Sequence, residues 1–141
     1  VSMPASAKSK GYVFKYKGVS VTMNGAAKKL IKKAGKPSKK TVKKSCAYKG
    51  KDRTYTYKDF QLKTYSKTNN GAEYVSEIRF RSNKAVTKEG IRIGSSLKAV
   101  TKKYGKAKAR FGVYTFKKGS SKLQIMLNGN KVSAIRYFAS K

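Results

Sequence analysis

An internal duplication constrains the fold of this chain more than any other sequence feature. Residues 21–37 align without a gap with residues 91–107. Three further blocks repeat in the same order: YTY (55–57) and YTF (114–116), FQL (60–62) and LQI (123–125), VSEIRF (75–80) and VSAIRY (132–137). Chance readily supplies one such match but not four in sequence order, so we predict two tandem repeats. The repeats span residues 11–83 and 84–141, and residues 1–10 read as a flexible leader.

Each repeat is predicted to begin with a short strand and a short helix. Val19, Val21 and Met23 alternate with polar residues, which is the period of a half-buried strand. The apolar residues that follow have helical spacing and face lysines on the opposite side of the helix. This stripe contains Ala27, Leu30, Ile31 and Ala34 in the first copy and Leu97, Val100 and Tyr104 in the second.

Capping residues predict where the two helices begin and end. Asn24 is expected to cap the first helix, and the Ser95-Ser96 pair the second, because these side chains accept an unpaired backbone N–H. Gly35 and Gly105 stand where a glycine ends a helix. Both helices are only about three turns long, so they must pack on a sheet to be stable.

The remaining blocks predict one antiparallel hairpin in each copy. Residues 60–65 and 74–81 flank Asn70-Gly71, and residues 123–127 and 131–138 flank Asn128-Gly129, a dipeptide suited to hairpin turns. We therefore predict an α+β fold in which both repeats form one continuous antiparallel sheet with the helices on one face. The alternative is two independent sheets joined back to back.

Alternation along the strands assigns the side chains to two faces of the sheet. The face toward the helices should carry Phe60, Leu62, Ile78, Phe80, Leu123, Ile125, Ile135 and Tyr137. The opposite face should carry Gln61, Lys63, Tyr65, Arg79, Arg81, Gln124, Met126, Arg136 and Phe138. The pairs Gln61/Gln124 and Arg79/Arg136 recur in both copies although they are not in the core.

These repeated polar pairs make the opposite face a candidate binding surface, with an ordinary solvated face as the alternative. The candidate binding residues are Gln61, Lys63, Tyr65, Arg79, Gln124, Met126 and Arg136.

The charge balance predicts attraction to polyanions. The chain has 36 lysines and arginines against five acidic residues, a net charge of +31. Lysine predominates and is spread through both copies, whereas arginine is the usual reader of base edges and the better phosphate clamp. We therefore expect diffuse attraction to an anionic envelope polymer. Nucleic-acid binding is the alternative function.

The residue inventory argues against common catalytic chemistry. The chain has no histidine, which excludes histidine-based triads and most zinc sites. Ser95 and Lys98 form a Ser-x-x-Lys pattern without its companion motifs, so the serine is better explained as a helix cap. Glu77 has Ala134 as its counterpart and is not a repeated feature. We predict no enzymatic activity, no cofactor and no metal.

Cys46 is the only cysteine, so no disulfide can form within the chain. We expect it to be a buried structural thiol, because free cysteine is among the most buried residue types. No stretch is long and apolar enough to span a membrane. We expect a monomer.

Two motifs resemble known families. GIRIGSSLKAVTKKYGKA (90–107) resembles the strand-to-helix motif of SmpA-type lipoproteins and of the β-lactamase inhibitor protein, in which two α+β repeats share one sheet. SCAYKGKD (45–52), YTY (55–57) and TKEGIRIGSS (87–96) resemble uncharacterised secreted lipoproteins of Gram-positive bacteria, which are usually far less basic. The resemblance implies an extracellular, envelope-associated protein with a lipid anchor upstream of Val1. It implies no catalytic residues.

Overall fold

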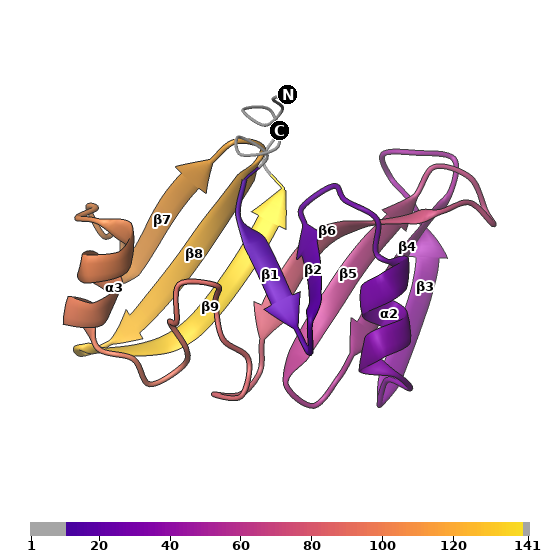
Figure 1. The fold of residues 1–141 in the computed structure, drawn as a ribbon. Helices are drawn as coiled ribbons and strands as arrows, with labels where there is room; N and C mark the ends of the chain where they lie inside the picture. Colours follow the sequence, from indigo (N-terminus) through magenta and orange to yellow (C-terminus); the bar gives the residue numbers. More distant parts are fainter. Residues whose placement is uncertain (1–10, 140–141) are drawn as a thin grey trace, which may run out of the picture.

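The chain folds as an α+β protein that is mostly antiparallel sheet with two helices (Figure 1). The structure is a computed structural model and describes residues 11–139; the predicted leader, residues 1–10, lies outside the described residues. The elements in chain order are β1 (Val13–Tyr16), β2 (Val19–Thr22), α2 (Lys28–Ala34), β3 (Lys39–Lys44), β4 (Lys51–Thr56), β5 (Phe60–Ser66), β6 (Glu73–Phe80), α3 (Leu97–Tyr104), β7 (Val113–Lys118), β8 (Ser121–Asn128) and β9 (Lys131–Ala139).

Seven of the strands form one sheet in the order β3-β4-β5-β6-β9-β8-β7. All neighbours in this sheet are antiparallel, and β6 and β9 meet at its centre. Alternation predicted the buried side of the hairpin strands correctly: Phe60, Leu62, Ile78, Phe80, Leu123, Ile125, Ile135 and Tyr137 are all buried.

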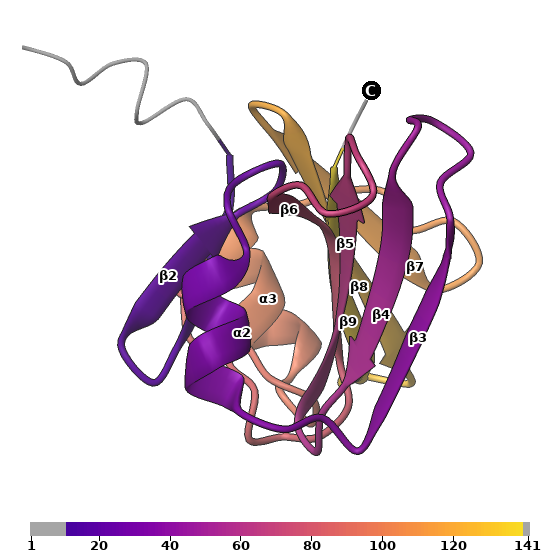
Figure 2. The ribbon, with the colours of Figure 1, turned by 90° about the vertical axis from the view of Figure 1, so that its right-hand side faces the viewer.

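The predicted first strand of each copy behaves differently from expectation. β2 pairs only with β1, in a separate two-stranded sheet, so it does not belong to the large sheet. Its counterpart around Ile91 forms no strand, although the Ile91 side chain is 2% exposed. The β1-β2 hairpin lies with α2 and α3 on one side of the seven-stranded sheet (Figure 2). Buried side chains such as Val21 hold it there, because covering the core removes their apolar surface from water.

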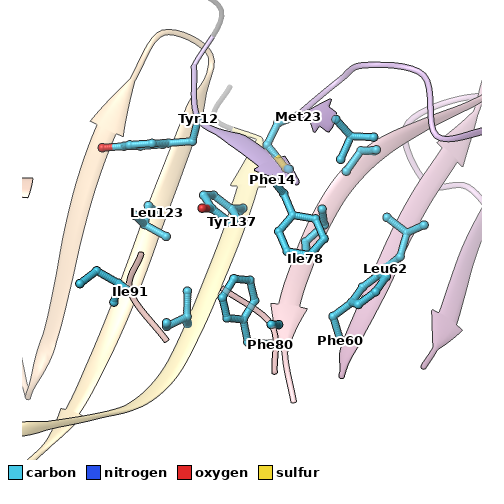
Figure 3. Packing of buried hydrophobic residues seen from close by; sticks show 14 of the residues in the cluster. Tyr12, Phe14, Met23, Phe60, Leu62, Ile78, Phe80, Ile91, Leu123 and Tyr137 are labelled. Atoms are coloured by element: carbon cyan, nitrogen blue, oxygen red, sulfur yellow. The ribbon is translucent and has the colours of Figure 1, made fainter. Parts of the chain in front are cut away.

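Phe14, from the β1 strand, joins the two halves of the core (Figure 3). Its fully buried ring lies 5.3 Å from Phe60, 5.6 Å from Phe80 and 6.2 Å from Tyr137, measured between ring centroids. Phe60 and Phe80 belong to β5 and β6, whereas Tyr137 belongs to β9. The hairpin therefore stabilises the junction between the two halves of the sheet as well as covering it.

The segments that precede the two helices are hydrogen-bonded in the same way. β6 and β9 pair with each other over only three residues, and beyond them each strand binds the segment before a helix. The Asn24 N–H donates to the Val75 carbonyl at 2.7 Å, and the Gly94 N–H donates to the Val132 carbonyl at 2.8 Å. The acceptor residues return hydrogen bonds to the next residue of each segment. Both helices are thus fixed against the sheet at corresponding positions.

Only one of the predicted helix caps forms. The Ser96 hydroxyl accepts the Ala99 N–H at 3.1 Å and caps α3. Asn24 does not cap α2; the N-cap residue is Ala27, which makes no side-chain cap bond. Asn24 instead has a φ of 67°, and its side-chain oxygen accepts a hydrogen bond from the Tyr65 hydroxyl at 2.9 Å. The helices do end at the predicted glycines, Gly35 and Gly105.

The two hairpin turns differ from the predicted ones. Asn128 pairs with Lys131, so the second turn is Gly129-Asn130, one residue later than predicted. Gly129 has a φ of 65°, and a two-residue turn with positive φ at its first position favours glycine there. In the first hairpin, residues 67–72 form a longer loop between β5 and β6.

Candidate functional site on the uncovered sheet face

The candidate site lies on the face of the seven-stranded sheet opposite the helices and the β1-β2 hairpin (Figure 2). One row of residues crosses this face from β4 to β7, each the direct cross-strand partner of the next. The row is Thr56, Gln61, Arg79, Arg136, Gln124 and Thr115. Between β4 and β7 it has the same residue types when followed from either end, and its centre lies between Arg79 and Arg136. The sheet therefore places the two arginines directly opposite each other on neighbouring strands.

Glu77 lies against both arginines of this row. Its Oε2 accepts a hydrogen bond from Arg79 at 3.2 Å and lies 3.6 Å from the nearest Arg136 nitrogen. The Glu77 side chain is 15% exposed, against 32% for Arg136 and 51% for Arg79. One carboxylate thus faces two cations, which leaves an excess positive charge in a partly desolvated position.

Arg136 is held by an aromatic contact, but its guanidinium group is not fully hydrogen-bonded. Its guanidinium lies 4.4 Å from the centre of the Phe138 ring, a favourable cation–π contact. Its Nε is buried and has no hydrogen-bond partner among the described residues. An unpaired buried donor costs free energy, so the arginine is incompletely satisfied by the described residues.

A hollow of about 210 Å³ opens beside Arg136 on the β8-β9 side of the face. Its walls are Arg79, Gln124, Met126, Ala134, Ile135 and Arg136. Ala134 aligns with Glu77 in the predicted repeat, and its methyl group is shorter than the aligned glutamate side chain. Met126, 45% exposed, adds an apolar wall.

A larger hollow of about 590 Å³ lies on the β3-β4-β5 side. Lys43, Asp52, Lys63, Tyr48 and Tyr65 contribute to its walls. Tyr48 comes from the loop after β3 and stacks on Tyr65, with ring centroids 5.0 Å apart and planes 15° apart. Burial raises the pKa of Tyr65 above its ordinary value. This hollow is therefore a mixed aromatic and charged surface.

The structure distributes the sequence-predicted binding residues over these features. Lys63 and Tyr65 line the larger hollow, and Gln61 lies in the central row, where its amide donates to Thr56 Oγ1 at 3.1 Å. The predicted residues that line the smaller hollow are Arg79, Gln124, Met126 and Arg136.

Sequence reasoning missed Glu77 as a member of this site because it has no acidic counterpart in the predicted second repeat. That asymmetry was the available signal: an acid facing repeated arginines in one copy only. Tyr48 was also missed, because no sequence pattern links a loop tyrosine to a strand 17 residues later.

Two other carboxylates accept hydrogen bonds from buried or partly buried hydroxyl groups. Glu73 Oε1 accepts hydrogen bonds of 2.7 Å from both the Tyr55 and Thr64 hydroxyls. Glu89 Oε1 accepts a hydrogen bond of 2.7 Å from the Tyr104 hydroxyl. Burial is the main cause that raises the pKa of Tyr55 and of Tyr104 far above the ordinary tyrosine value. These groups hold the core together and are poorly placed to exchange protons with a substrate.

The prediction that Cys46 is a buried thiol is wrong, because the side chain is exposed. It lies in the loop after β3, where the neighbouring Ser45 turns inward instead. The buried Ser45 hydroxyl accepts the N–H groups of Ala47 and Tyr48, which closes the loop and leaves Cys46 outside.

Ser95 does not cap α3, contrary to the sequence interpretation, because Ser96 takes that place. The Ser95 hydroxyl accepts the Arg92 N–H at 3.0 Å in the preceding turn.

Within residues 11–139, no three histidine, cysteine, aspartate or glutamate side chains gather where they could hold a metal ion. None of the described helices is long and apolar enough to cross a membrane. The chain matched no protein-family model, no curated protein and no solved structure.

Proposed function

We propose that this protein is a non-enzymatic binding module that recognises its partner through the uncovered face of the seven-stranded sheet. The central row carries the proposal. Arg79 and Arg136 are direct cross-strand partners, and like charges in this position destabilise a sheet. A face that met only water would gain nothing from having this arginine in both copies. Glu77 supplies one negative charge for these two guanidinium groups, and an anionic partner would offset the remaining positive charge and give the pair a function.

The same face supports the proposal that the chain consists of two tandem repeats, residues 11–83 and 84–141. The row of cross-strand partners has matching residue types on both sides of its centre, and the segments before both helices make matching hydrogen bonds. Leu30 and Val100, aligned in sequence, are 0% and 1% exposed. Duplication thus accounts for why one arginine is presented twice.

The charge outside this row supports an envelope or extracellular location. All six residues of β3, four of them lysines, are exposed along one edge of the sheet. Lysines on an edge strand discourage pairing with other sheets, and they also attract polyanions without forming a pocket. Diffuse charge of this kind suits retention among anionic envelope polymers, in agreement with the resemblance to secreted Gram-positive lipoproteins.

Capture from envelope extracts tests the proposal. Wild-type protein is compared with an Arg79→Ala, Arg136→Ala variant and with a Lys32→Ala, Lys33→Ala control, which removes the same charge from exposed positions on α2. At about 0.15 M salt, where the Debye length is about 8 Å, the arginine variant should lose its specific partner while the lysine control keeps it. Equal capture by all three proteins would exclude this face.

Salt dependence separates this function from nucleic-acid binding. A nucleic-acid interface should keep a preference for strand type or sequence at moderate salt. If every polyanion, heparin included, is released together as salt rises, the lysines act by charge alone. A specific nucleic-acid complex that survives moderate salt would contradict the proposal.

A further inference from the structure

The smaller hollow differs from the equivalent place in the first copy by two side chains: the cross-strand pair Lys63 and Glu77 corresponds to Met126 and Ala134. Glu77 and Ala134 occupy corresponding positions, and so do Arg79 and Arg136. In the first copy the Glu77 carboxylate contacts the arginine two residues later on its own strand and, diagonally, the arginine of the other copy. The same relation connects position 134 with Arg136 and Arg79, and these three residues line the hollow.

The hollow is therefore a position for a carboxylate that the chain itself does not supply. Arg136 has a buried Nε without a hydrogen-bond partner, and Glu77 is the only acid in contact with the two guanidinium groups among the described residues. A second carboxylate beside Ala134 would balance the two cations and offer acceptors to Arg136. Arginine forks match the geometry of a carboxylate in this way.

We propose that this hollow binds the carboxylate of an acidic side chain on a partner protein, in the position that corresponds to Glu77. The inference rests on the proposed function of the uncovered face and specifies the chemistry of its partner. The partner residue is a glutamate or aspartate whose carboxylate reaches Arg79 and Arg136. Its methylene groups then lie against Met126 and Ala134.

The surroundings favour a carboxylate over a phosphate. Glu77 is mostly buried and ion-paired between the same two arginines, so a dianionic phosphate would lie close to an existing negative charge. The volume of about 210 Å³ and the Met126 and Ala134 walls suit a short aliphatic stem that ends in a single charge. The chain also shows, at Glu77, that a carboxylate fits between these guanidinium groups.

The first test supplies the missing group from within the chain. An Ala134→Glu variant should have a higher melting temperature than Ala134→Gln at neutral pH. The difference should shrink as the pH falls below about 4.3, the pKa of an ordinary glutamate, and disappear at the lower pH where the introduced carboxylate is protonated in the folded protein as well. Ala134→Gln is the matched control because it fills the same volume without charge. No difference between the variants at neutral pH would contradict the proposed chemistry.

The second test needs no variant to begin with. Ac-Gly-Glu-Gly-NH₂ is titrated into wild-type protein with Ac-Gly-Gln-Gly-NH₂ and inorganic phosphate as comparisons, and the Arg136 Nε–H resonance is followed by NMR. The glutamate peptide should shift this resonance at a concentration at least about tenfold lower than the other two, as expected for one charge-assisted bidentate pair. In the Ala134→Glu protein the shift should be lost.

The outcomes separate this inference from the proposed function. If phosphate shifts the resonance as strongly as the glutamate peptide, or if the peptide binds the Ala134→Glu protein equally well, the carboxylate assignment is wrong. If Ala134→Glu captures the envelope partner like Ala134→Gln while Arg79→Ala, Arg136→Ala does not, the face binds but the hollow takes no carboxylate. If the arginine variant also captures normally, the proposed function itself fails.

Discussion

Replacing Glu77 by glutamine should destabilise the protein through the two arginines that it contacts. Glutamine keeps the size of the side chain but removes the charge, so Arg79 and Arg136 then repel each other across the β6-β9 junction. The effect is expected to be electrostatic, because the geometry and the apolar contacts of the side chain are retained.

The exposed fractions of the three side chains set the magnitude. Exposed ion pairs contribute about 0.2–1 kcal/mol, whereas breaking a buried pair costs about 3–5 kcal/mol. Arg79 is 51% exposed, so its pair belongs near the lower range, at about 0.5 kcal/mol. Arg136 is 32% exposed and Glu77 15%, so their pair lies between the two ranges, at about 1.5 kcal/mol. We therefore expect the free energy of unfolding to fall by about 2 kcal/mol.

Urea unfolding at low and high salt measures this change. For a typical slope of about 2 kcal/mol per molar urea, the midpoint should fall by about 1 M. Raising salt from about 0.05 M to about 1 M shortens the Debye length to about 3 Å and should reduce the difference from wild type by roughly half.

Asp52→Asn provides a matched control. It removes the same unit of charge from the same sheet face, and Asp52 has no ion-pair partner among the described residues. It should change the free energy of unfolding by less than about 0.5 kcal/mol. If Glu77→Gln costs no more than Asp52→Asn, or if its cost does not depend on salt, the arginine cluster is not the source of the effect.

Three further predictions concern the core, the buried tyrosines and the cysteine. In urea titrations, Leu30→Ala should lower the free energy of unfolding by about 3 kcal/mol and Val100→Ala by about 2 kcal/mol, because both side chains are fully buried. A cost below about 1 kcal/mol at either position would contradict its role in the core. Burial raises the pKa of Tyr57 to about 12, whereas the unfolded chain loses this proton near pH 10. The stability that this tyrosine contributes below pH 10 should therefore be lost as the pH rises from about 10 through 12. A melting temperature that stays constant from about pH 9 to pH 11 in high salt would refute this. Cys46 should react with a thiol reagent in the native protein at close to the rate of the unfolded chain, and slow native reaction would show that the loop shields it.

The sequence by itself determined the α+β class, the hairpin strands and the side chains that they bury. Side chains alternate between faces with a period of two, so placing Leu62 and Ile125 in the core fixes Lys63 and Gln124 on the opposite face. The helix ends were equally local, because a glycine that stops a helix acts within one turn. These features depend on neighbours in the chain, which the sequence displays directly.

The tertiary structure alone decided which strand edges met and which surfaces were covered. The pairing of β6 with β9 places Arg79 opposite Arg136, 57 residues away. Because of this pairing, Glu77 lies near both arginines, and a hollow lies beside Ala134. Long-range contacts also explain why the β1-β2 hairpin is not part of the large sheet, because its buried side chain Phe14 contacts three strands of the core. Each of these choices compares the free energy of competing long-range contacts, and no local pattern of residues encodes that comparison.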